Sequence, residues 1–248
     1  MHVLLRLSVT LLTCATLSGC ATTGASSEDN DPLEPLNREI FAFNNALDSA
    51  VIKPAAEGYR AVLPQYVRDR IRSVIDNLNE PLIFANNVLQ LRFDAAVTTL
   101  GRFMANSTAG LGGMFDRATA DGMPRQSGDF GQTLYRWGVG SGPYLVLPVL
   151  GPSNVRDAIG FGVDSYVSPV GFIGSEGNQR IFATTKAVVG GLDTRERNIE
   201  SVELLKENAI DFYAQIRNIV QQRRRAVLNE ARETDPSKDL IDPAPPPR

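Results

Sequence analysis

Histidine and cysteine are almost absent from this sequence. Its 248 residues include one histidine and two cysteines, and all three, His2, Cys14 and Cys20, lie at the N-terminal end. Structural zinc sites need cysteine or histidine, a cysteine nucleophile needs a thiolate, and a serine triad needs a histidine between nucleophile and carboxylate. None of these sites can be built from the residues that follow Cys20.

Motifs for other catalytic chemistry and for nucleotide binding are missing too. No lysine stands in a Ser-x-x-Lys arrangement, no serine in Gly-x-Ser-x-Gly, and no Gly-x-x-x-x-Gly-Lys occurs. Gly138, Gly140 and Gly142 do not have the Gly-x-Gly-x-x-Gly spacing of a dinucleotide-binding turn. We therefore expect a protein that is not an enzyme and that needs no cofactor and no metal.

Long apolar runs are absent except at the start of the chain. Residues 1–19 have the positive Arg6, an apolar run and small residues, which is typical of a secretory signal peptide. The sequence Leu17-Ser18-Gly19-Cys20 resembles the lipobox of bacterial lipoproteins, in which the cysteine becomes the acylated first residue. Ala21 favours export to the outer membrane. The alternative is an ordinary signal peptide followed by an unrelated cysteine.

Charge and composition are unremarkable after the signal peptide. The formal net charge of the whole chain, −3, gives no reason to expect a nucleic-acid partner. Residues 20–30 are small and polar, as in a flexible tether, and residues 233–248 are too poor in apolar side chains to fold, so we predict a disordered tail. Residues 31–232 are enough for one domain.

Between the tether and the tail the apolar residues recur with helical spacing, and we predict an all-α fold. Asp31 is expected to cap a first helix whose apolar stripe is Leu33, Leu36, Ile40, Phe43 and Leu47. Further helices are predicted from Pro64 to Pro81, from Asp94, from near Asp129, Ser153 and Asn178, and from Arg195 to about Arg232 with a break near Asn208. Such stripes either pack against each other or, beside an acyl anchor, lie in one membrane leaflet.

Several separated sequence blocks are familiar. They are Asp31-Pro32-Leu33-Glu34-Pro35-Leu36-Asn37-Arg38, Phe41-Ala42-Phe43-Asn44, Asn77-Leu78-Asn79-Glu80-Pro81, Arg102-Phe103-Met104-Ala105-Asn106-Ser107, and Phe130-Gly131-Gln132-Thr133-Leu134 through Arg156-Asp157. In this order they resemble the MlaA/VacJ family of outer-membrane lipoproteins, and the resemblance extends from Asp31 to about Arg225. The family shares Asp-Pro-Tyr near its last helix, whereas this chain has Asp211-Phe212-Tyr213, which leaves the helix break there in doubt.

The resemblance implies a fold and a function. Family members form a ring of amphipathic helices in the periplasmic leaflet of the outer membrane, around a central amphipathic channel and often beside trimeric porins. They remove mislocalised phospholipids from the outer leaflet and pass them to a soluble periplasmic carrier of the MlaC type, which maintains lipid asymmetry. The alternatives are a structural lipoprotein that tethers porins and, less in keeping with the sequence, a phospholipase.

The candidate functional residues fall into three groups. Cys20 is the expected lipid anchor. Arg136, Arg156 and Asp157 flank the stretch from Gly138 to Asn154 and are candidate headgroup contacts, with surface solvation or helix-end pairing as the alternative; Arg223 to Arg225 could meet lipid heads or the carrier, or form a solvated helix end. Two groups of glycines are together expected to be the flexible ends of a hairpin that lines the channel, or else parts of a buried connecting loop: Gly138, Gly140 and Gly142, and Gly110, Gly112 and Gly113. The residues expected to line the channel or contact lipid are Phe41, which is off the first stripe, Phe43, Asn44, Gly112, Gly113, Gly138, Gly140, Gly142, Tyr144, Leu145 and Leu147.

Overall fold

The computed structural model describes residues 31–168 and 176–233. The predicted signal peptide, Cys20, the tether and nearly all of the predicted tail lie outside these residues. The elements, in chain order, are α2 (Glu34–Leu47), a π-helical turn η1 (Asp48–Ile52), α3 (Lys53–Val62), α4 (Gln65–Leu89), α5 (Phe93–Thr108), α6 (Arg117–Ala120), α7 (Phe130–Arg136), β1 (Tyr144–Leu147), β2 (Gly151–Asn154), α8 (Val155–Val167), α9 (Glu176–Arg197), α10 (Ile199–Asn208) and α11 (Phe212–Glu233).

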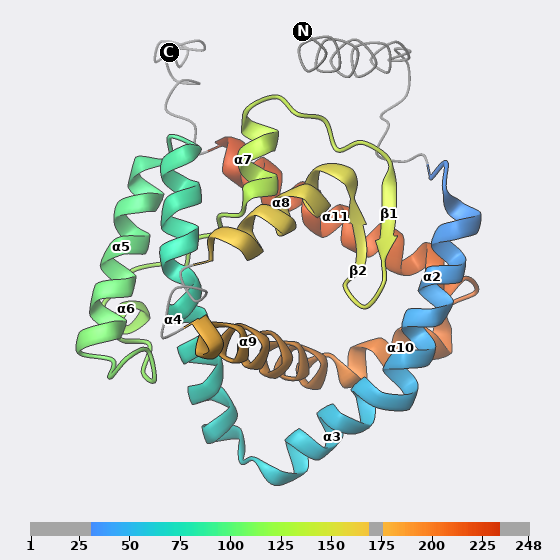
Figure 1. The fold of residues 1–248 in the computed structure, drawn as a ribbon, viewed down its shortest axis with the longest axis horizontal. Helices are drawn as coiled ribbons and strands as arrows, with labels where there is room; N and C mark the ends of the chain where they lie inside the picture. Colours follow the sequence, from blue (N-terminus) through green and yellow to red (C-terminus); the bar gives the residue numbers. More distant parts are fainter. Residues whose placement is uncertain (1–30, 169–175, 234–248) are drawn as a thin grey trace, which may run out of the picture.

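The elements are arranged as a ring (Figure 1). Helices α4 and α5 form one side, α2 and α10 form the opposite side, and α3 joins the two below. The β1–β2 hairpin and the helices α7, α8 and α11 lie along the upper part, and α9 crosses the lower part between α4 and α10. The all-α prediction is confirmed, with one small antiparallel hairpin, in which Tyr144 pairs with Asn154 and Val146 with Pro152.

Helix boundaries match the predicted capping signals in some places and contradict them in others. Asp129 and Asn154 cap α7 and α8. The side chain of each accepts a hydrogen bond from the backbone N–H three residues later. Asp31 does not cap the first helix, because its carboxylate accepts hydrogen bonds from the Asn37 amide, at 2.7 Å, and from the Tyr213 hydroxyl. The first helix therefore begins at Glu34.

Two further corrections concern α3 and α4. Pro81 does not end its helix, because α4 continues to Leu89. A proline inside a helix costs about 3 kcal/mol, and the turns that follow are held by polar side chains buried against neighbouring helices, such as Asn86 and Asn87. Helix α3 was not predicted; it follows α2 through η1 without an intervening loop. The predicted break near Asn208 is confirmed, since α10 ends there and Ala209 is extended.

The interior is polar. Among the described residues, the largest side chains with less than 2 % exposure are Arg102, Arg156, Gln90, Gln132, Asn37, Asn87, Thr99 and Thr133. The apolar cluster is small: Tyr144, Val146 and Tyr213, with Ile40 and Phe41 against it. Buried polar groups need partners, so this fold is held mainly by hydrogen bonds and ion pairs between elements.

Much of the outside is apolar. On α5, Val97, Leu100 and Met104 are 69 %, 45 % and 55 % exposed, whereas Thr99 and Arg102 on the opposite face are buried. On α2, Leu36 and Phe43 are both 55 % exposed. These side chains therefore face outward, whereas Ile40 of the predicted α2 stripe packs against the apolar cluster.

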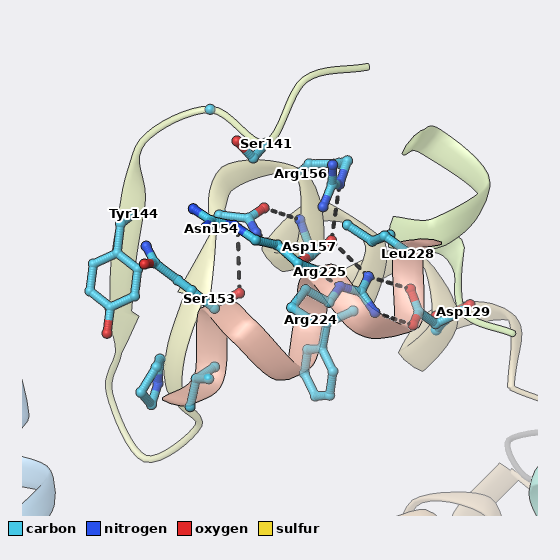
Figure 2. Close-up of a pocket in the computed structure, with 16 residues that line it drawn as sticks. Asp129, Ser141, Tyr144, Ser153, Asn154, Arg156, Asp157, Arg224, Arg225 and Leu228 are labelled. Atoms are coloured by element: carbon cyan, nitrogen blue, oxygen red, sulfur yellow. Dashed lines mark hydrogen bonds and ion pairs between the residues drawn. The ribbon is translucent and has the colours of Figure 1, made fainter. Parts of the chain in front are cut away.

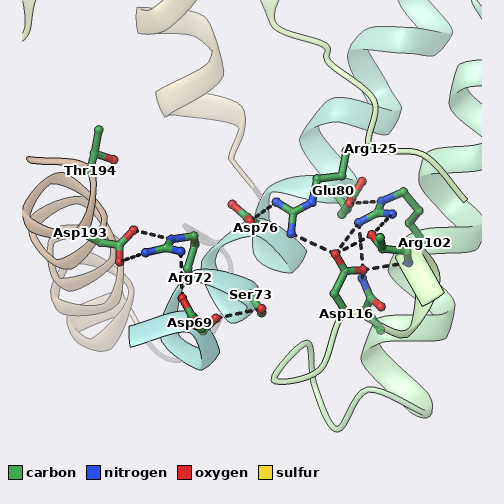
Figure 3. Close-up of polar contacts among 12 residues, drawn as sticks. Asp69, Arg72, Ser73, Asp76, Glu80, Arg102, Asp116, Arg125, Asp193 and Thr194 are labelled. Carbon is green, nitrogen blue, oxygen red and sulfur yellow. Dashed lines mark hydrogen bonds and ion pairs between the residues drawn. The ribbon is translucent and has the colours of Figure 1, made fainter. Parts of the chain in front are cut away.

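An ion-pair network joins α4 to its neighbours (Figure 3). Arg102 of α5 donates from Nε to Glu80 at 2.9 Å and from Nη2 to Asp116 at 3.2 Å. Arg72, in the first half of α4, binds both carboxylate oxygens of Asp193 on α9 at 2.9 and 3.1 Å. Burial raises the pKa of Glu80, although the pairing with Arg102 opposes this. No helix in the described part of the chain is both long enough and apolar enough to span a membrane.

Candidate functional site

Two asparagines of α2 hold one edge of the hairpin. The Asn37 side chain donates to the Tyr144 carbonyl at 3.1 Å and accepts from the Val146 amide at 2.8 Å. Asn44 repeats the pattern seven residues later, donating to the Leu147 carbonyl at 2.9 Å and accepting from the Val149 amide at 2.8 Å. Seven residues are about two helical turns, so both amides lie on one face of α2. They satisfy backbone groups that an edge strand otherwise leaves open.

The hairpin, α8 and α11 enclose a cavity of about 340 Å³. Figure 2 shows the hairpin on one side of it and α11 across from the hairpin. The wall is mixed, with carboxylates and guanidinium groups at one end and apolar side chains elsewhere. The residues that line the cavity include Asp129, Ser141, Ser153, Arg156, Asp157, Phe161, Val220, Arg224 and Leu228.

Arg224 of α11 joins two elements at this cavity. Its guanidinium donates to both oxygens of Asp129 at 2.7 and 2.8 Å and to both oxygens of Asp157, each at 2.8 Å. Figure 2 shows it lying between the two carboxylates. Bidentate pairs of this kind are the strongest side-chain hydrogen bonds, so α11 is tied to the start of α7 and of α8 at once.

The charges in this cluster balance locally. Burial opposes ionisation of Asp157, but the bonds from Arg224 and Arg156 outweigh burial and lower the pKa of Asp157 below its usual value. Burial likewise opposes the charge of Arg224, and the two carboxylates outweigh it and raise the pKa of Arg224. Both groups are therefore ionised at neutral pH.

Arg156 differs from Arg224 in how its donors are used. Its side chain is 1 % exposed, Nε donates to Asp157 at 3.1 Å, and the guanidinium carbon lies 5.2 Å from the centre of the Tyr135 ring. Nη1 and Nη2 are buried without a hydrogen-bond partner in the described part of the chain. The site therefore keeps two charged donors that its own ion pairs do not use.

Comparisons with known proteins decide the family. The family model for the MlaA lipoprotein matches residues 29–227. The chain belongs to the MlaA lipoprotein family. It is 33 % identical over 241 residues to the intermembrane phospholipid transport system lipoprotein MlaA of Haemophilus influenzae, covering 94 % of each chain. It is 32 % identical over 230 residues to the Escherichia coli protein of the same name, covering 91 % of this chain and 89 % of that one.

A solved structure supports the same assignment. It comes from work on the structural basis for maintenance of bacterial outer membrane lipid asymmetry, and it superposes with a TM-score of 0.71 at 32 % identity. The match covers 80 % of this chain and 99 % of that chain. The fold described above is therefore the fold of the MlaA family.

In this MlaA-family chain, several predicted site residues lie together. Asn44 and Leu147 meet at the α2–hairpin contact. Leu145 lies in β1 opposite Ser153, and Tyr144 is buried in the strand that Asn37 holds. Phe41 packs inside the protein, 5.4 Å from the ring centres of both Phe212 and Tyr213. Phe43 is exposed, and Cys20 lies outside the described residues.

Arg136 ends α7, and the glycines that follow it lead along the chain into β1. Arg136 donates to the backbone carbonyls of Gln90 and Ala231 at 3.0 and 3.1 Å, so it links α7 to α4 and α11. Gly138, Gly140 and Gly142 form the loop that leads into β1. Gly142 has φ of +67°, and a Cβ there would lie 3.0 Å from the Cβ of Val155.

The predicted pairing of the two glycine groups is wrong. Gly112 and Gly113 are not part of the hairpin: their amides donate to Ser107 and Asn106 at the end of α5, and Gly113 packs against Asn77, where a Cβ would lie 2.5 Å from the Asn77 Cβ. The hairpin is built by residues 144–154 alone and turns at Val149, which has φ of +67°.

Three important residues were missed or misjudged from sequence. Asn37 was quoted only as part of a block, although a second asparagine seven residues later on an apolar helix is a signal that both amides serve one partner. Arg224 was taken for a lipid or carrier contact or for part of a solvated helix end, whereas it is paired with Asp129 and Asp157. Asp129 was predicted only as a position near which a helix starts.

A second cavity is almost wholly apolar. It has a volume of about 490 Å³ and lies between α4 and α9, where Ile71, Val74 and Leu78 face Phe182 and Val189. The predicted α4 stripe thus lines a cavity rather than a packed core. No group of histidine, cysteine or acidic side chains among the residues that the structure describes could hold a metal ion.

Proposed function

We propose that this chain is an acylated outer-membrane lipoprotein that removes mislocalised phospholipids from the outer leaflet and hands them to a soluble periplasmic carrier. In this proposal, acylated Cys20 anchors the protein in the periplasmic leaflet of the outer membrane. Its partner proteins are trimeric porins and an MlaC-type carrier. Two relatives are named as lipoproteins of an intermembrane phospholipid transport system, which supports the substrate class.

The observation that carries this proposal is the inverted distribution of side chains. Apolar residues such as Val97 and Phe43 face outward, while Arg102 and Gln132 are buried. A water-soluble protein gains its stability from the opposite arrangement. Outward apolar stripes around a ring suit a protein whose outside contacts acyl chains.

A ring with polar inward groups also answers the physical problem of lipid movement. A charged headgroup crosses hydrocarbon at a cost of several kcal/mol or more. A passage bordered by the hairpin, α8 and α9 would offer the headgroup polar partners while the chains stay in contact with apolar surface. We infer that the central channel runs between these elements.

The deciding experiment reconstitutes the full acylated protein in vesicles that contain a labelled phospholipid and adds a purified MlaC-type carrier. We expect labelled lipid on the carrier only when the lipoprotein is present. Capture of a porin without any lipid transfer would favour the tethering function. Release of lysophospholipid or fatty acid from the vesicles would favour a phospholipase. The control is the same vesicles with the carrier alone.

A further inference from the structure

Arg156 carries a charge whose binding capacity the fold uses only in part. One edge of its guanidinium donates to Asp157 and one face lies over Tyr135. The two terminal nitrogens make no hydrogen bond to any described residue. A buried charged donor without an acceptor destabilises the folded protein. Its presence therefore indicates that the residue has a role other than stabilising the fold.

Arg102 shows what a buried arginine looks like when it serves the fold. It is equally buried, at 1 % exposure, and all three of its nitrogens donate: Nε to Glu80, Nη1 to the Met123 carbonyl at 2.6 Å, and Nη2 to Asp116. The two arginines have the same burial and opposite hydrogen-bond satisfaction. The contrast separates a guanidinium whose donors the fold uses fully from one whose terminal donors have no acceptor.

The surroundings of Arg156 select the kind of ligand. It lines the 340 Å³ cavity together with Ser141, which is 7 % exposed. The Arg156 amide donates to the Ser141 carbonyl at 3.1 Å, and Figure 2 shows both side chains at the same end of the cavity. The carboxylates nearby, Asp129 and Asp157, are already bound by Arg224.

The two NH2 groups of the Arg156 guanidinium and the Ser141 hydroxyl can all donate hydrogen bonds to an acceptor ligand. The planar fork of arginine matches a group that presents two oxygens, such as phosphate. The rest of the wall, including Phe161, Val220 and Leu228, is apolar. The occupant therefore combines a phosphate ester with an apolar part, and the volume is within the range of small-molecule sites.

We propose that Arg156 and Ser141 form a subsite that binds the phosphodiester of a phospholipid. The inference rests on the proposed function, since it names where the transported lipid is held by its headgroup. Asp157 orients the arginine through Nε, and Arg224 keeps that carboxylate charged and in place. The glycerol and the first part of the acyl chains lie against the apolar wall.

The test measures ligand binding to the full acylated protein in detergent by isothermal titration. The probes are a dihexanoyl phospholipid below its micelle concentration, dihexanoylglycerol, which lacks the phosphate, and inorganic phosphate. Arg156→Gln is expected to weaken binding of the phospholipid at least about tenfold, because a charge-assisted bidentate contact exceeds one factor of ten in affinity. Binding of dihexanoylglycerol is expected to be unchanged.

Stability distinguishes the ligand role from a structural role. Arg156→Gln is expected to shift Tm by no more than about 3 °C, whereas Arg102→Gln, which leaves Glu80 and Asp116 without their buried partner, is expected to lower Tm by about 10 °C. If Arg156→Gln does not fold, Ser141→Ala decides. It is expected to weaken phospholipid binding about threefold, while Ser73→Ala, on α4 away from this cavity, where the hydroxyl donates to the Asp69 carbonyl at 2.9 Å, leaves binding unchanged.

Two results overturn the subsite. One is phospholipid binding that is equal in wild type, Arg156→Gln and Ser141→Ala. The other is an Arg156-dependent affinity for inorganic phosphate without any such dependence for the phospholipid, which would make the site one for a free anion. Vesicle-to-carrier transfer is measured on the same preparations. If transfer is normal and binding is unchanged in the variants, the subsite is refuted and the proposed function stands. If phospholipid binding depends on Arg156 but no transfer occurs, the subsite stands and the proposed function is refuted.

Discussion

Gly131 and Gly160 are the residues at which α7 and α8 come closest. A Cβ on Gly160 would lie 2.4 Å from the Gly131 backbone nitrogen, and a Cβ on Gly131 would lie 2.5 Å from an oxygen of Asp157 and 2.7 Å from Nη2 of Arg224. The absence of both side chains lets the two helices approach and leaves room for the ion pairs. Glycine at both positions therefore permits the close packing on which the ion-pair cluster depends.

We therefore expect Gly160→Ala to lower the free energy of unfolding by about 1–3 kcal/mol, because the new methyl group has to displace backbone. Gly162, on the same helix, is the matched control, since a Cβ there meets nothing within 4 Å. Gly162→Ala should be neutral or stabilising by up to about 1 kcal/mol. Denaturant titration of the two variants in detergent measures this, and equal stabilities would contradict the packing argument.

Single residues of the site could be predicted only in part. Arg156 and Asp157 were identified from sequence because they adjoin the glycine- and proline-rich stretch. Arg224 was not assigned to them, because its partners lie 67 and 95 residues away in the chain and no local pattern records such a distance. The unused donors of Arg156 are likewise a property of the assembled cavity.

Helices α2 and α11 hold the hairpin region through different contacts. Asn37 and Asn44 of α2 hold the edge of β1, and Arg224 of α11 holds the starts of α7 and α8. The hairpin itself adds only two short strands, which are marginal in isolation. Its position therefore depends on these contacts between elements.

Asn44→Ala is expected to free the turn of the hairpin while the protein stays folded. Loss of two hydrogen bonds costs about 1–3 kcal/mol, and the Val149 amide loses its acceptor. Hydrogen exchange at Val149 should become at least about tenfold faster. Asn45→Ala is the control, because the Asn45 side chain makes no hydrogen bond within the described residues. Unchanged exchange in Asn44→Ala would mean that the hairpin is held elsewhere.

A deletion tests the same contact through its spacing. Removing Phe41 and Ala42 shortens the interval between Asn37 and Asn44 from seven residues to five and rotates Asn44 by about 200° around the helix. Only one of the two amides can then meet β1. We expect lipid transfer that is no longer regulated, seen as lost lipid asymmetry in cells. Normal asymmetry would contradict a role for the α2–hairpin contact in the function.

The ion pairs of α11 predict a pH dependence. The pKa of Asp157 is lowered in the folded protein, so its contribution is fully present above the unfolded value near 3.8 and is lost as pH falls below it. At neutral pH, Asp157→Asn should cost about 3 kcal/mol, because Arg224 and Arg156 lose a buried partner. Between about pH 4 and pH 2 the difference between wild type and variant should shrink, as measured by denaturant titration. A constant difference would exclude this linkage.

Local signals predicted most elements but not what their faces contact. The caps of α7 and α8 and the break at Asn208 follow from short-range hydrogen bonding, which the sequence records. Helix α3 was missed because α2 continues into it through η1 without a stop signal, and Pro81 was misread because tertiary contacts outweighed its local cost. Periodicity gives an apolar face and leaves open whether that face meets protein or lipid.

At the scale of the whole molecule, polar contacts hold the ring together and apolar side chains cover much of its outside. Ion pairs and amides link α4 to α5 and to α9, as in proteins whose helices gain little from hydrophobic packing against each other. In the proposed function, the apolar exterior supplies the free energy of association with a bilayer. Folding and the proposed membrane contact then use different faces of the same helices.

These two uses can be separated experimentally on α5. We expect the triple variant Val97→Ser, Leu100→Gln, Met104→Gln to keep its fold, because these side chains are 69 %, 45 % and 55 % exposed, while its affinity for vesicles falls. Each apolar side chain removed from a lipid contact forfeits up to about 1.5–3 kcal/mol. To remove the contribution of the proposed acyl anchor, the measurement is made on protein carrying Cys20→Ala, by flotation with vesicles. The control is Thr99→Ala, on the buried face of the same helix, which should lower the free energy of unfolding and leave vesicle binding of the folded protein unchanged. Undiminished flotation of the triple variant would show that α5 faces something other than lipid.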